Sequence, residues 1–143
     1  MTTRRDFLKN TCSLCLALGG MSAVSTFLQS CSAIPVIKSS ASDKKVAVPL
    51  SSFHEKYPYV LVRVASLEND ILLVKKNDGT YTALYMECTH QNQPLTITGN
   101  GLHCAAHGSS FDFDGNVTQS PAARPLKKYP ATLSGESVTI DIS

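Results

Sequence analysis

Residues 88–112 read CTHQNQPLTITGNGLHCAAHGSSFD. One residue separates Cys88 from His90, and two residues separate Cys104 from His107. Thiolates and imidazoles are ligands that both zinc and iron–sulfur clusters accept. Because the two Cys-His pairs lie so close together in the chain, the stretch predicts a four-ligand metal centre supplied by two neighbouring loops.

The order of the four ligands favours one metal centre over another. In zinc fingers the two cysteines come first and the two histidines follow. Here each arm of the motif supplies one cysteine and one histidine. That order suits a two-iron cluster in which one iron takes both sulfurs and the other takes both ring nitrogens. A structural zinc site in a non-redox binding module is the alternative.

The pairs C-x-H and C-x-x-H resemble the signature of the Rieske [2Fe–2S] family over roughly residues 46–143. Gly108, Ser109 and Asp112 also match the second cluster loop of that family. The resemblance implies one [2Fe–2S] cluster per chain, with Ser109 donating to a bridging sulfide. The implied ligands are Cys88, His90, Cys104 and His107. The stretch SPAARPLKKYP then resembles the family's proline loop, in which Pro121 would cover the cluster.

Four positions depart from the quinol-oxidising members of the family. Gln93 and Ala106 stand where those members carry a disulfide between the loops, and Phe111 replaces a tyrosine whose hydroxyl donates to a cysteine sulfur. Gln91 replaces an apolar shielding residue, which argues against quinol docking. Because fewer donors stabilise the reduced form less, we expect a midpoint potential below that of the quinol-oxidising members.

The first residues resemble an export signal. TTRRDFLKN resembles the twin-arginine signal, which exports proteins already folded, and LQSC at residues 28–31 resembles a lipoprotein cleavage box. Cys31 would then carry a lipid that tethers the protein to a membrane of the bacterial envelope. An uncleaved anchor over the same segment and an ordinary cysteine are the alternatives. Cys12 and Cys15 are interpreted as apolar filler of the signal.

The sequence divides into a signal or anchor at residues 1–31, a flexible serine-rich linker at 32–45 and a domain at 46–143. Short runs rich in β-branched and aromatic residues predict strands in the domain, and two Asp-Gly turns separate neighbouring runs. The expected fold is an all-β, antiparallel sandwich of small sheets, and the resemblance adds a two-loop cluster tip. The expected strands are 46–50, 57–64, 70–76, 80–86, 110–113 and 137–142.

The net charge and the basic residues outside the two Cys-His pairs bear on which partners the protein could bind. The formal net charge is +2, and its surplus lies in the first nine residues, so nothing favours nucleic acid as a partner. His103 is expected to face away from the cluster, since neighbouring strand residues point to opposite faces. His54 is expected at the surface. Lys127 and Lys128 could contact an acidic partner but are interpreted as a solvated pair, and the same two interpretations apply to Arg124.

These observations predict a one-electron carrier on the periplasmic side of the cell envelope. Its partners would be redox proteins such as a cytochrome or a periplasmic oxidoreductase. A small subunit of a larger oxidoreductase is the second hypothesis. In either case no substrate chemistry is expected from this chain itself, because it shows no nucleophile–base pair, paired carboxylates or phosphate-binding glycine loop.

Overall fold

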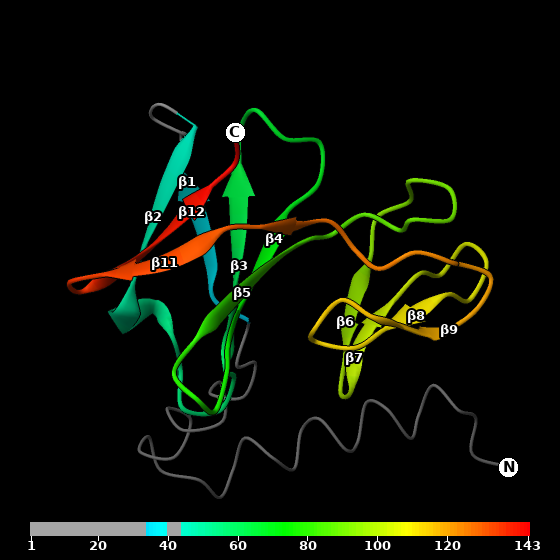
Figure 1. The fold of residues 1–143 in the computed structure, drawn as a ribbon, viewed down its shortest axis with the longest axis horizontal. Coiled ribbons are helices and arrows are strands. Elements are labelled where there is room, and N and C mark those ends of the chain that lie inside the picture. Colours follow the sequence, from blue (N-terminus) through cyan, green and yellow to red (C-terminus); the bar gives the residue numbers. More distant parts are fainter. Residues whose placement is uncertain (1–33, 40–43) are drawn as a thin grey trace, which may run out of the picture. The chain divides into compact units, whose positions relative to one another are not determined.

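The computed structural model describes residues 34–39 and 44–143, and nearly all regular structure in these ranges is β-strand (Figure 1). The exception is η1, a single 3-10 turn at Leu50–Ser52. The strands form three sheets of five, three and four strands. The expected all-β class of small sheets is therefore confirmed.

Two of the sheets share a core of alternating apolar residues. The strand order of the larger sheet is β1 (Val36–Ser39), β3 (Tyr59–Val64), β4 (Ile71–Lys75), β5 (Tyr81–Tyr85) and β10 (Lys128–Tyr129). The order of the smaller sheet is β11 (Ala131–Ser134), β12 (Ser137–Asp141) and β2 (Lys45–Pro49). Every second residue of β2 and β12 is buried, as expected for strands with one face on a core. These side chains pack against residues from β3 and β4.

Strand β4 has apolar side chains on both faces and so joins two cores. Ile71 and Leu73 belong to the core between the two sheets above, whereas Leu72 and Val74 belong to a second core. All four side chains are buried. Successive strand residues point to opposite faces, so a continuous apolar run fits a strand that is covered on both sides.

The third sheet carries the region of interest. It is a meander of β6 (Thr96–Thr98), β7 (Gly101–His103), β8 (Ser110–Phe111) and β9 (Val117–Gln119), seen beside the larger sheet in Figure 1. Leu102 and Phe111 pair across β7 and β8 and join the second core. Gly101 lets β7 approach β8 closely, because an added Cβ would lie 2.1 Å from the carbonyl oxygen of Phe111.

Both predicted Asp-Gly turns are present. The first joins β4 to β5, with Gly79 at φ +82° and Asp78 accepting hydrogen bonds from the backbone and hydroxyl of Thr80. The second joins β8 to β9, with Gly115 at φ +79°. Glycine adopts a positive φ without the steric cost that a Cβ brings, which explains its place in both turns.

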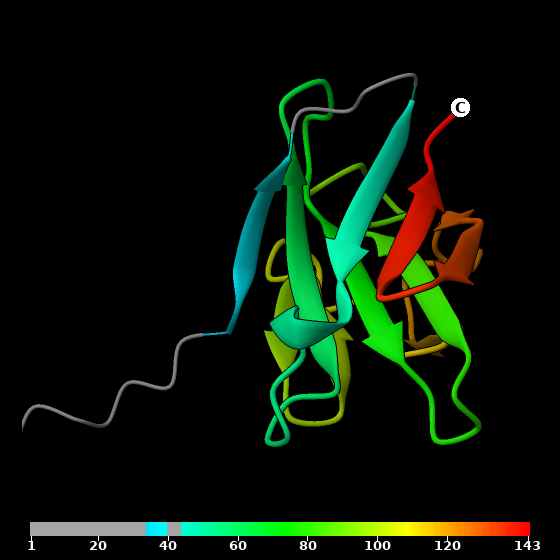
Figure 2. The ribbon, with the colours of Figure 1, turned by 90° about the vertical axis from the view of Figure 1, so that its left-hand side faces the viewer.

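The expected linker at residues 32–45 needs correction, because part of it is a strand. Val36–Ser39 form β1, which pairs in parallel with β3 along the edge of the larger sheet (Figure 2). The folded unit starts at Ile34, twelve residues earlier than the expected start at residue 46. The pairing is also an exception to the expected antiparallel pattern. The short Val-Ile run supplies β-branched residues, and the open edge of β3 supplies hydrogen-bonding partners.

Several expectations concern residues outside the described ranges. These are the twin-arginine segment, Cys12, Cys15 and Cys31, and the remainder of the linker at 32–33 and 40–43. Among the described residues, no helix has the length and apolar character needed to cross a bilayer.

Candidate metal centre

The predicted ligands lie on two loops with the same backbone hydrogen-bond pattern. In the first loop (residues 88–93), Cys88 N–H donates to the carbonyl of Gln93 at 2.8 Å, and Asn92 N–H donates to the carbonyl of Cys88 at 2.8 Å. In the second loop (residues 104–109), Cys104 N–H donates to the carbonyl of Ser109 at 2.9 Å, and Gly108 N–H donates to that of Cys104 at 3.0 Å. Each cysteine therefore opens a tight turn of the same form.

A left-handed residue closes each turn at the same distance from its cysteine. Asn92 has φ +51° and Gly108 has φ +82°, and each follows its cysteine by four residues. Glycine and asparagine are the residues that adopt this conformation most readily. The shared offset explains why an Asn-Gln pair and a Gly-Ser pair occupy equivalent positions in loops of otherwise different sequence.

The elements on either side fix where the loops lie. The first loop leaves β5, and an isolated bridge between Glu87 and Pro94 holds its two ends together. The second loop connects β7 directly to β8. Cys88 and Cys104 both belong to the second core, together with Leu72 of β4. The core thus anchors both loops through their cysteines.

The four predicted ligands divide by burial. Cys88 and Cys104 are each only 1% exposed and form no disulfide, whereas His90 and His107 are exposed. The two imidazole rings meet edge to face, with centroids 5.2 Å apart. Thiols therefore lie on the inner side of the site and imidazoles on the outer side, an arrangement that allows both thiolates to bind one iron and both imidazoles to bind the other.

This donor set fits a [2Fe–2S] cluster with two thiolate and two imidazole ligands. Across residues 34–39 and 44–143, no group of three or more His, Cys, Asp or Glu side chains gathers closely enough to hold a single ion. A two-iron cluster asks for only two protein ligands on each metal. The absence of a disulfide between the loops follows from Gln93 and Ala106, neither of which carries a thiol.

A third segment, the proline loop (residues 120–127), is tied to both cluster loops. The Ala122 N–H donates to Ser109 Oγ at 3.0 Å, and Ser109 is completely buried. The Thr89 hydroxyl donates to the carbonyl of Arg124 at 2.6 Å. Pro121 lies in this segment and is exposed. The Ser109 hydroxyl, predicted to donate to a sulfide, also serves as an acceptor for the proline loop.

The two histidines that were not predicted as ligands, His103 and His54, lie in different environments. His103 Nδ1 and Ser110 Oγ lie 3.2 Å apart across β7 and β8, and His54 is exposed as predicted. Phe111 is 1% exposed and packs in the second core. Sequence reasoning missed Thr89 and Asn92. Asn92 could have been found in the sequence, because it follows Cys88 by four residues, as Gly108 follows Cys104.

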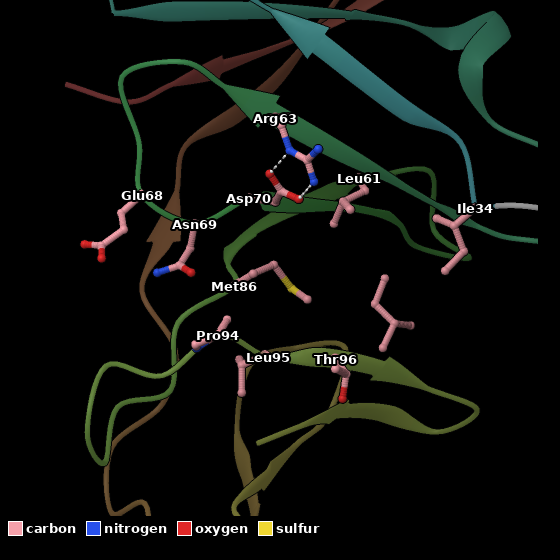
Figure 3. A pocket seen from close by; sticks show the side chains of 11 residues that line it. Ile34, Leu61, Arg63, Glu68, Asn69, Asp70, Met86, Pro94, Leu95 and Thr96 are labelled. Atoms are coloured by element: carbon pink, nitrogen blue, oxygen red, sulfur yellow. Dashed lines mark hydrogen bonds and ion pairs between the residues drawn. The ribbon is translucent and has the colours of Figure 1, made fainter. Parts of the chain in front are cut away.

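Two hollows flank the first loop. The rear pocket, of about 550 Å³, has an apolar wall that includes Leu61, Met86 and Leu95 (Figure 3). At its rim Arg63 donates two hydrogen bonds to the carboxylate of Asp70, at 2.9 and 2.8 Å. The second, of about 480 Å³, is called here the cationic hollow. It is lined by Tyr85, Glu87, Thr89, Asn92, Arg124, Pro125 and Lys127.

Comparison with known families agrees with this site. The family model of the Rieske [2Fe-2S] domain matches residues 45–130, which is more than half of the chain. The chain belongs to the Rieske [2Fe–2S] domain family. A Rieske domain carries a [2Fe–2S] cluster, so the expected cofactor is confirmed, and the zinc alternative has no support.

Relatives of this Rieske chain include iron–sulfur subunits. The cytochrome b6-f complex iron-sulfur subunit 1 of Synechocystis is 30% identical to this chain over 98 residues. The match covers 65% of this chain and 55% of the relative. Its counterpart in Chlorobaculum thiosulfatiphilum is 28% identical over 80 residues, covering 54% of this chain and 44% of the relative. The chain thus spans about half the length of these relatives.

A solved structure shares the Rieske fold. The plasma-membrane Rieske protein PetC3 of Synechocystis superposes with a TM-score of 0.56 at 22% identity. The match covers 66% of this chain and 97% of that protein. At this level of identity the likeness concerns the fold alone.

Proposed function

We propose that this chain is a one-electron carrier of the bacterial cell envelope. Cys88 and Cys104 would ligate one iron of the cluster, and His90 and His107 would ligate the other. When bound, the cluster takes up and releases a single electron. The observation that carries the proposal is the division of the donors, with both thiols buried and both imidazoles exposed.

The residues around the site define what the protein contributes. Buried thiols hold the inner side of the site away from water, and the exposed rings give a redox partner direct access. The Ser109 hydroxyl lies inside the protein, where a hydrogen bond toward the site is least weakened by solvent. Gln93, Ala106 and Phe111 bring no disulfide and no hydroxyl, which supports a midpoint potential below that of quinol-oxidising Rieske proteins.

The decisive experiment is EPR combined with potentiometry on the purified full chain. We expect a Rieske-type signal in the reduced protein, with a midpoint inside the family range of about −150 to +300 mV but away from its upper end. His90→Ala should abolish this signal, and His103→Ala should keep it. A colourless protein that contains stoichiometric zinc would overturn the proposal.

The envelope location rests on the arginine pair at residues 4 and 5 and on Cys31. The protein is exported in folded form, and its N-terminal segment keeps it at a membrane through a lipid or an uncleaved anchor. Fractionation of cells expressing Arg4→Lys/Arg5→Lys should find the protein retained in the cytoplasm. Cys31→Ser should release it from the membrane if the lipid is the tether, and labelled palmitate distinguishes lipid from anchor.

Membership of a larger oxidoreductase is the second candidate function. It is favoured by the names of both relatives above, each of which is a subunit of a complex. Mild-detergent purification of the tagged chain from its own membranes tests this candidate. Stoichiometric co-purification of a second redox protein would assign the chain to a complex, and a lone chain would assign it to the carrier role.

A further inference from the structure

The cluster loops are free of fixed charge, and the proline loop beside them carries two cations. No Asp, Glu, Lys or Arg occurs at residues 88–109. The proline loop, which hydrogen-bonds to both cluster loops, adds Arg124 and Lys127, and both are exposed. The charged side chains around the first cluster loop therefore include two cations of the proline loop and the carboxylate of Glu87, which precedes Cys88.

These two cations face the same hollow as the first cluster loop. Arg124 and Lys127 line the cationic hollow together with Thr89 and Asn92. Thr89 lies between Cys88 and His90 in the chain, and its hydroxyl binds the carbonyl of Arg124. A partner that covers the hollow would therefore touch residues directly adjacent to His90.

The two cations also lack anionic partners in the described part of the chain. The ion pairs there are Arg63 with Asp70 and Lys76 with Asp114, and neither involves the hollow. The Lys127 ammonium lies 4.5 Å from the ring centroid of Tyr129, a cation–π contact that brings no formal negative charge. The one carboxylate in the hollow, that of Glu87, accepts a hydrogen bond from the neutral amide of Asn69 at 3.1 Å, so two cations and one carboxylate leave the hollow with a formal charge of +1.

We infer that the cationic hollow is the docking surface for a redox protein with an acidic face. Carboxylates of the partner would complement Arg124 and Lys127, and the contact would bring its redox group toward His90. Complementary charge of this kind raises the rate of encounter and fixes the orientation of docking. The inference rests on the proposed electron-transfer function and replaces the earlier interpretation of Lys127 as merely solvated.

The test uses the full-length holoprotein and stopped-flow electron transfer from a reduced plant-type [2Fe–2S] ferredoxin with an acidic surface. Such ferredoxins have potentials near −400 mV, so the transfer is downhill. The wild-type rate should fall as salt is added. Arg124→Glu/Lys127→Glu should slow the transfer about tenfold or more at low ionic strength and reverse its salt dependence. Arg124→Gln/Lys127→Gln should give an intermediate rate.

Lys45→Glu/Lys75→Glu is the matched control, since it makes the same change in net charge at two exposed strand positions. This control should keep the wild-type rate. An equal rate in the hollow variant, or an equal loss in the control, would overturn the inference. The small-anion probe is hexacyanoferrate(III), which oxidises the reduced protein. If the hollow variant lost as much of its rate with hexacyanoferrate(III) as with ferredoxin, the hollow would attract anions in general. That result would also overturn the docking surface.

Each variant is first checked by EPR for an unchanged signal and midpoint. A wild-type chain without a cluster would refute the proposed function, whereas a normal cluster with unaltered kinetics would refute only the docking surface. The two failures are therefore distinguishable.

Discussion

The two cluster loops have the same backbone but different supports. Each starts at a buried cysteine, closes at a left-handed residue four positions later and presents one histidine to solvent. The second loop is held from inside by the buried Ser109, whereas the first is held at the surface by Thr89. Backbone geometry thus sets the position of the sulfurs, and side chains determine how firmly each loop is held.

The largest expected effect comes from removing a sulfur, and it should be equal in the two loops. Cys88→Ser and Cys104→Ser should each reduce iron and acid-labile sulfide to below about a tenth of the wild-type content, because metal binding and folding are coupled. Metal analysis and visible absorption measure this. His103→Ala, next to Cys104, is the control and should keep the cluster. Full retention in one cysteine variant would show that the loops do not share the cluster.

A smaller effect should separate the two supports. Ser109→Ala leaves the buried Ala122 N–H without an acceptor, which costs about 1–3 kcal/mol, whereas Thr89→Val removes a more exposed hydrogen bond worth about 1 kcal/mol or less. The urea midpoint for loss of visible absorbance should therefore fall further in Ser109→Ala. Redox titration should also show a lower midpoint potential in Ser109→Ala, with Thr89→Val unchanged. The reverse ranking would contradict the assignment of inner and outer supports.

The closing residues should differ less. Gly108→Ala places a Cβ at φ +82°, which costs about 1–2 kcal/mol of backbone strain even though the nearest atom, on Gln119, lies 3.8 Å away. Asn92→Gly should alter the free energy of unfolding by only about 0.5 kcal/mol or less. Urea unfolding of the two variants measures the difference. Equal stability of Gly108→Ala and wild type would mean that the second loop adopts another conformation.

The smallest expected effect depends on pH and concerns Asp112, which has no counterpart after the first loop. Burial alone would raise the pKa of Asp112, but hydrogen bonds from Asn116 and from the Asp114 N–H outweigh burial and hold this pKa below its ordinary value. A lowered folded-state pKa contributes stability above about pH 4, and that stability is lost as pH falls through the folded-state pKa.

Asp112→Asn should therefore flatten the acid side of the stability profile. Thermal loss of visible absorbance, followed from pH 7 downward, measures the profile in both proteins. Parallel profiles would indicate that the turn after the second loop does not depend on the carboxylate. Asp141→Asn, at the end of β12, is the comparison variant for a lowered aspartate pKa remote from the loops.

Sequence alone was sufficient for the features that depend on side-chain chemistry at fixed spacing. The two Asp-Gly turns and the longer strands follow from such local patterns, and the four donors predicted in the same way lie on two loops of the same form. The strand Val36–Ser39 was missed because its backbone partner, β3, lies 25 positions farther along the chain. β6, β7 and β9 have three residues each, too few to show a period of two. The Thr89–Arg124 hydrogen bond joins residues 35 positions apart, beyond any local signal.

The parallel pairing of β1 with β3 has a consequence for how far the domain can travel. From residue 31 to the start of β1 is five residues, a span of at most about 17 Å when fully extended. If Cys31 carries the anchor, the segment between the anchor and β1 is therefore far shorter than a fourteen-residue linker would be. The domain would then stay close to the lipid headgroups. Mobile redox partners would have to diffuse to it, because the domain itself could not move between distant partners.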